Sequence, residues 1–170
     1  MTKKTLSLTW LLVALTAGFA ASAARAGEPE LRFGPCRAVR VIDGATADLS
    51  CRGRLMPVRL RNVAAPQSGQ IGYAESARAL VELLRARELY IAFGGAAAPA
   101  TEPDGRLSVY LYDQSGANQN VALVFLGWGA YADAADSDAL DHSFRAAQDD
   151  ARNANRALWT VRSFSASRTP

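Results

Sequence analysis

Apolar and polar residues alternate along five stretches of the chain, a period of two that is typical of β-strands with one buried face. These stretches are residues 37–43, 45–51, 57–63, 88–93 and 106–112. In the last of them, Leu107, Val109 and Leu111 share one face. The pattern therefore predicts five short strands that each turn one face toward a core.

Residues 73–86 and 138–158 place their apolar residues on one side of a helix, and residues 118–126 predict a short, very apolar helix. Helices interspersed with half-buried strands indicate an α+β fold, in which three helices attach to a small closed barrel. The 170 residues are enough for one packed domain and too few for two comfortable ones.

The N-terminal residues have the features of a secretory signal peptide. Two lysines precede an apolar run, Trp10–Ala21, that is too short for a comfortable membrane span. Small residues then offer cleavage sites after Ala23 and after Ala26. We therefore expect an exported protein, periplasmic or secreted, with no membrane association after cleavage. An uncleaved anchor is the alternative.

The expected organisation has four parts. They are a signal peptide at 1–26, an N-terminal lead-in at 27–36, a folded domain at 37–159 and a flexible tail at 160–170.

The formal net charge of +3 arises near the N-terminus. From Gly27 onward, sixteen arginines balance sixteen acidic residues, which excludes a uniformly basic nucleic-acid-binding protein. Residues 32–61 nevertheless hold seven arginines. They form either an arginine-lined patch on the barrel or an ordinary solvated surface.

The two cysteines, Cys36 and Cys51, flank a predicted hairpin. Asp43-Gly44 is a strong signal for a two-residue turn, and that turn would place the two cysteines opposite each other. Directly opposed residues are close enough for a disulfide, which an oxidising compartment favours. We therefore predict a disulfide, with two free thiols as the alternative.

Several short motifs occur in a fixed order along the chain: VIDGAT at 41–46, VRL at 58–60, VAAPQ at 63–67, DGR at 104–106, NVALV at 120–124 and ALW at 157–159. Together they resemble the staphylococcal nuclease, or thermonuclease-like, family over nearly the whole predicted domain. This resemblance implies an OB-fold, a five-stranded barrel with three helices.

In that family two aspartates hold Ca²⁺, a glutamate assists the attacking water and two arginines bind the phosphate. At the corresponding positions this chain has Ala45 and Ala64 for the aspartates and Gln67 for the glutamate. Both arginines remain, as Arg59 and Arg106. Since Ca²⁺ needs several oxygen ligands and a glutamine cannot accept the proton of water at neutral pH, we expect no bound metal, no cofactor and no working catalytic residue.

The resemblance and these substitutions together predict a catalytically inactive or impaired pseudonuclease. Arg59 and Arg106 would bind phosphate, on a nucleic acid or on another anionic ligand, and the domain would act as a binding or interaction module. A protein is the alternative binding partner. Tyr110 and Tyr112 share a face with Arg106 and are candidates for ligand contact.

Two alternatives belong to other functional classes. The first is an active metal-dependent phosphodiesterase with a rearranged site, in which other acids, such as Asp43 with Asp104 or Glu75, converge on a metal. The second is a scaffold subunit of an exported complex, which would use the apolar region 118–126 or the acidic third helix.

Overall fold

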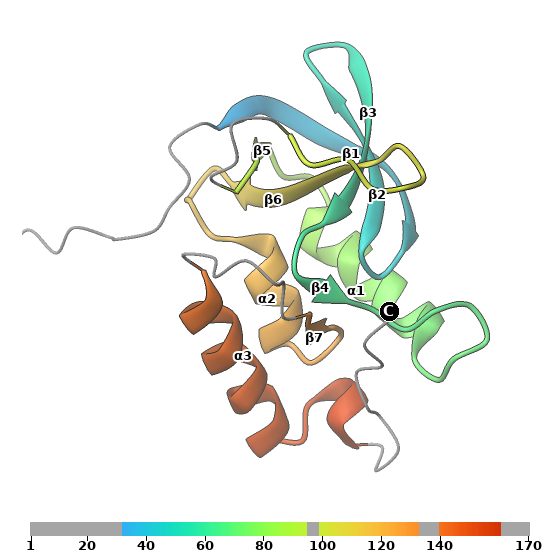
Figure 1. Ribbon diagram of the computed structural model, residues 1–170, viewed down its shortest axis with the longest axis vertical. Helices are drawn as coiled ribbons and strands as arrows, with labels where there is room; N and C mark the ends of the chain where they lie inside the picture. Colours follow the sequence, from blue (N-terminus) through green and yellow to red (C-terminus); the bar gives the residue numbers. More distant parts are fainter. Residues whose placement is uncertain (1–31, 95–98, 133–139, 161–170) are drawn as a thin grey trace, which may run out of the picture.

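The computed structural model describes residues 32–94, 99–132 and 140–160, in which five strands form a closed barrel with three helices around it (Figure 1). The barrel order is β1 (Phe33–Asp43), β2 (Thr46–Cys51), β3 (Arg54–Leu60), β6 (Leu107–Asp113) and β5 (Leu89–Ala92). The other elements are β4 (Val63–Ala64), β7 (Ala130–Tyr131), α1 (Tyr73–Leu84), α2 (Gln119–Phe125), α3 (Asp141–Asn153) and the 3-10 helix η1 (Ala157–Thr160). The predicted α+β, OB-like architecture is confirmed.

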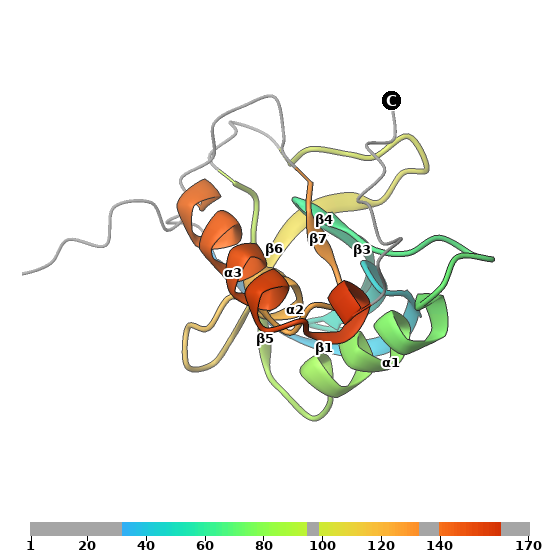
Figure 2. The ribbon, with the colours of Figure 1, turned by 90° about the horizontal axis from the view of Figure 1, so that it is seen from below.

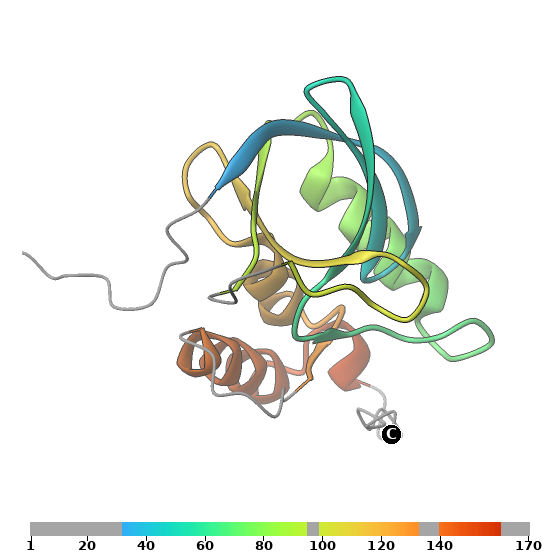
Figure 3. The same cartoon turned by 45° about the horizontal axis from the view of Figure 1, so that its top comes forward.

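Figure 3 shows the barrel as a ring of strands. Because side chains alternate along each strand, the apolar side chains lie inside this ring. Leu49, Val58 and Val109 are fully buried there. The ring closes through β3 and β6, which run parallel and pair Val58 with Leu107. Parallel neighbours need a long connection, and the segment containing α1 and β5 provides it.

The helices cover different parts of the barrel. Helix α1 contacts β1, whereas α2 contacts both β6 and α3, which lies beside it (Figure 1, Figure 2). The buried side chain of Asn120 fastens α2 to the barrel. Its carbonyl accepts from the amide of Leu111 at 3.0 Å, and its amino group donates to the carbonyls of Arg61 and Val109.

The outer face of β6 changes character along its length. Tyr110 and Tyr112 are 0% and 1% exposed, because α2 packs on this half of the strand. The Tyr110 ring lies against Phe144 of α3, and its hydroxyl accepts from the Asn62 side chain at 2.8 Å. The expectation that these tyrosines contact a ligand at the surface is therefore wrong.

The β1–β2 hairpin confirms the predicted disulfide, since Cys36 and Cys51 are paired across the strands and bonded. The turn differs from the prediction. Asp43 pairs with Thr46, so the turn residues are Gly44 and Ala45, and two register shifts in β1 restore the predicted cysteine pairing.

Gly44 is required for packing. It is not among the glycines with positive φ, but a Cβ on it would lie 1.8 Å from the Ser76 hydroxyl oxygen of α1. The hairpin tip therefore sits directly against the helix.

Several element boundaries also differ from the sequence-based expectations. Strand β1 begins at Phe33, so residues 33–36, expected in the lead-in, belong to the barrel. The strand predicted at 57–63 ends at Leu60, because Asn62 has a left-handed conformation with φ of 60°. The chain then forms the separate strand β4, which pairs with β7.

The last predicted helix is shorter than its apolar pattern. Helix α3 ends at Asn153, and the left-handed residues Asn155 and Ala157 turn the chain into η1. Leu158 is nevertheless buried, since the reversed chain brings it back to the core. The predicted signal peptide and tail residues 161–170 lie outside the described residues. Within the described part of the chain, no helix is long and apolar enough to span a membrane.

Removing the disulfide should lower stability substantially. The bond closes a loop between residues separated by 15 positions, and a loop of this size corresponds to about 3 kcal/mol in the chain-entropy account. We expect the Cys36→Ala/Cys51→Ala double variant to lose about that much free energy of unfolding in urea titrations. An unchanged midpoint would show that the bond does not constrain the unfolded chain.

Asp113 should make stability depend on acid pH. Burial would raise the pKa of Asp113, but hydrogen bonds from the Ser115 hydroxyl, the Ala117 and Ser115 amides and Arg87 outweigh it and lower the pKa. Because the folded pKa lies below the unfolded value, this stabilisation is complete above the unfolded pKa and is lost as pH falls through the folded one. In urea titrations between about pH 5 and pH 2, Asp113→Asn should therefore lose less stability than the wild type. Identical losses would contradict this account.

Candidate anion-binding site

Arg59 lies at the middle of a polar row on the outer face of the barrel. It pairs with Thr46 of β2 on one side and with Ser108 of β6 on the other. These two neighbours are 4% and 7% exposed, and Arg59 itself is half-buried. Across the described ranges, no acidic side chain pairs with Arg59. A half-buried guanidinium flanked by hydroxyls and lacking a carboxylate favours the approach of an external anion.

Arg106 lies next to this row. It immediately precedes Leu107, the partner of Val58, so alternation puts its side chain on the same outer face as Arg59. Unlike Arg59, it is engaged by two acids. Its Nε donates to Asp104 at 2.9 Å, and one terminal nitrogen lies 3.5 Å from Asp48. The amide and guanidinium of Arg106 hold the pKa of Asp104 below its usual value.

Asp48 is a residue of the candidate site that sequence reasoning missed. Its side chain is only 7% exposed, and one carboxylate oxygen accepts from Nε and Nη2 of Arg40 at 3.0 and 2.6 Å. The other oxygen faces Arg106. Strand register was the signal that could have placed this acid between the two arginines: β1–β2 pairs Asp48 with Arg40, and β2–β3 pairs it with Pro57, beside which Arg106 falls.

The substituted positions of the nuclease-like motifs lie on two segments: Ala45 is in the β1–β2 turn, Ala64 is in β4 and Gln67 follows β4. Ala45 is fully buried, and its carbonyl accepts from the Leu60 amide at 2.7 Å. A Cβ on the adjacent Gly44 would lie 2.9 Å from the Cβ of Ala65, which follows Ala64. The exposed Gln67 side chain donates to the Ala65 carbonyl at 3.3 Å. None of the three substituted positions itself carries a carboxylate.

These residues do not fit Ca²⁺. The alanines have no side-chain oxygen, and Asp43 acts as a turn residue whose carboxylate accepts from the Ala45 amide at 2.7 Å. Glu75 pairs instead with Arg78 at 2.9 Å. In residues 32–94, 99–132 and 140–160, no three of the His, Cys, Asp and Glu side chains form a cluster that could hold a metal. The rearranged-site alternative therefore gains no support.

A scan against protein-family models finds no match for this chain, and a search of curated proteins finds none either. The closed barrel with three helices is compatible with an OB-fold. The resemblance to staphylococcal nuclease therefore rests on the short motifs and on this architecture.

Removing the Asp48 carboxylate should destabilise the fold. Asp48→Ala leaves Arg40 and Arg106 without a shared partner, and hydrogen bonds to charged groups typically contribute about 1.5–3 kcal/mol. We expect a loss of about 2 kcal/mol in the free energy of unfolding, measured by urea titration. Asp104→Ala is the matched control, because it removes an exposed partner of the same Arg106 and should have little effect. Equal effects of the two changes would contradict a structural role for Asp48.

Proposed function

We propose that this chain is an exported, catalytically impaired domain of the staphylococcal nuclease type that binds phosphate-bearing or other anionic ligands. The observation that carries the proposal is Arg59, half-buried between two hydroxyl side chains and without an acidic partner among the described residues. A phosphate oxygen at this position would receive charge-assisted hydrogen bonds.

Arg106 supplies the second contact in this proposal. Its pair with Asp104 involves a carboxylate that is 60% exposed, and such pairs contribute little in water. A doubly charged phosphate can therefore displace Asp104 from the guanidinium. Asp48 is 7% exposed and remains in place, so it keeps the arginine directed across the outer face.

Binding without efficient hydrolysis follows from the missing groups. Gln67 cannot take a proton from water, and loss of a general base typically costs 10²- to 10⁴-fold in rate. Loss of a metal that stabilises the developing charge raises the barrier by several kcal/mol more. Arg59 and Arg106 therefore bind the anion, and the site does not hydrolyse it efficiently.

Export is the remaining part of the proposal. The Cys36–Cys51 disulfide fits an oxidising compartment, and residues 1–26 have the pattern of a signal peptide. Both features support a periplasmic or secreted location.

The scaffold alternative has weaker support. Phe125 and Leu126 of the α2 region are each 40% exposed, but the guanidinium of Arg156 lies 4.1 Å over the Phe125 ring and covers part of it. This region therefore offers only a small apolar surface.

A titration with inorganic phosphate tests the proposed site. The arginine side-chain Nε signals of the purified protein would be followed by NMR, and we expect those of Arg59 and Arg106 to shift together. Arg59→Ala should weaken binding about tenfold or more, because it removes charge-assisted contacts. Arg54→Ala is the matched control, since it removes an exposed arginine from the same strand.

Two results would contradict the proposal. Phosphate could leave both arginine signals unchanged, or Arg54→Ala could weaken binding as much as Arg59→Ala does. The second result would indicate attraction by general surface charge.

A further inference from the structure

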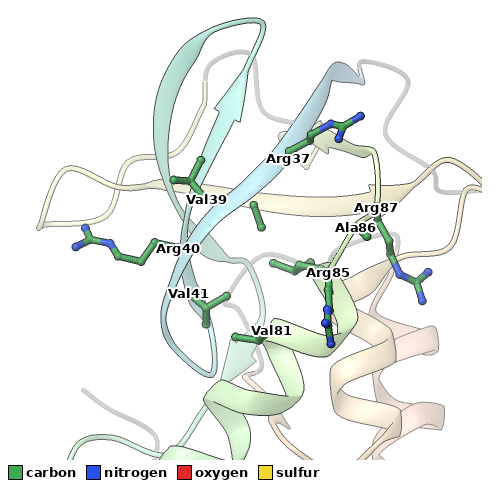
Figure 4. A pocket seen from close by; sticks show the side chains of 10 residues that line it. Arg37, Val39, Arg40, Val41, Val81, Arg85, Ala86 and Arg87 are labelled. Carbon is green, nitrogen blue, oxygen red and sulfur yellow. The ribbon is translucent and has the colours of Figure 1, made fainter.

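A groove of about 360 Å³ lies between β1 and the C-terminal end of α1, outside the Arg59 row. Figure 4 shows Val41 of β1 and Val81 of α1 facing each other across it. Arg40 lies to one side of this apolar centre, and Arg37 and Arg87 lie to the other. The groove therefore combines an apolar floor with basic ends.

The strand along this groove has an unpaired edge. β1 pairs with β2 from Cys36 to Asp43, but it pairs with β5 only at Phe33 and Cys36. Among the described residues, the stretch 37–43 therefore has a strand neighbour on one side only. Such an edge offers backbone donors and acceptors to an added strand, except at Ile42, whose carbonyl accepts from the Tyr73 hydroxyl of α1 at 3.4 Å.

The groove presents positive charge to solvent. Arg40 and Arg87 are held by carboxylates that are 7% and 6% exposed, so in these pairs the acid faces inward and the guanidinium outward. Arg37 and Arg85 make longer pairs, of 3.8 and 3.6 Å, with exposed glutamates. Exposed pairs of this kind are weak and easily exchanged, and none of the described residues that line the groove is acidic.

The floor holds apolar side chains that the fold leaves uncovered. Val39 is 62% exposed and Val81 is 42% exposed, and both line the groove together with the buried Leu84. Covering these valines would remove apolar surface from water, which favours an occupant that also carries an aliphatic group.

We propose that this groove binds an extended acidic peptide segment of a partner protein. The peptide adds as a strand to the open edge of β1 and places an aliphatic side chain between Val41 and Val81. Its carboxylates reach Arg37 and Arg85, whose present partners are loosely held. Backbone pairing supplies the orientation, and the alternation of acidic and aliphatic side chains supplies the specificity.

Fluorescence anisotropy with a labelled peptide of alternating glutamate and valine tests this proposal. The purified protein should bind it, and Arg37→Glu/Arg85→Glu should weaken binding by about tenfold or more. Val81→Asp should weaken it as well, by placing a like charge in the floor. Arg54→Glu, which changes an exposed arginine outside the groove, should leave binding unchanged.

Hydrogen exchange of the same complex reports the binding mode. The peptide should slow backbone amide exchange within residues 37–43, which attraction by side-chain charge alone would not do. Single-stranded DNA and inorganic phosphate serve as competitors and should not displace the peptide.

Three results would overturn the proposal. The peptide could fail to bind the wild type, which would mean that the arginines only protect the edge of β1 from pairing with strands of other chains. Single-stranded DNA could displace it fully without edge protection, which would make the groove a nucleic-acid surface. Binding could also depend on Arg59 rather than on Arg37 and Arg85. The test variants leave Arg59 and Arg106 intact, so this proposal and the anion site can fail separately.

Discussion

The parallel pairing of β3 with β6 is the constraint on which both the barrel and the candidate site depend. It closes the ring, and in the same register it sets Arg59 beside Ser108 and brings Arg106 toward Pro57 and Asp48. Arginines from distant parts of the sequence therefore share one outer face because the barrel is closed. The polar row on that face is a direct product of the pairing that buries the core.

Much of the fold could be predicted from residue patterns, because barrel strands have one buried face and therefore alternate. The turns and strand ends that could not be predicted depend on local backbone conformations, which the hydropathy pattern does not indicate. The tight turn at Arg52-Gly53 has positive φ at both residues, a conformation in which arginine is unusual. The Arg52 side chain donates a hydrogen bond from Nε to the Gly34 carbonyl at 2.8 Å. Asn62 likewise breaks a run that reads as one continuous strand.

The candidate site was less accessible to sequence reasoning. Motif positions predicted where Arg59, Arg106 and the substituted alanines lie, but not which charges they face. The role of Asp48 follows only from the strand register. Its buried carboxylate pairs with Arg40 of β1 and with Arg106, which lies just before β6. Through Arg40 the same carboxylate also reaches the edge of the β1–α1 groove. Pairing between strands that are distant in the sequence determines these side-chain contacts.

The central claim is that recognition survives in this fold after hydrolysis has been lost. The most direct test is cleavage of single-stranded DNA by the purified protein, with and without Ca²⁺, beside an Ala45→Asp/Ala64→Asp/Gln67→Glu variant. The account predicts no Ca²⁺-dependent cleavage by the natural protein, with cleavage appearing in the variant that restores the three carboxylates. Ca²⁺-dependent cleavage by the natural protein would contradict it.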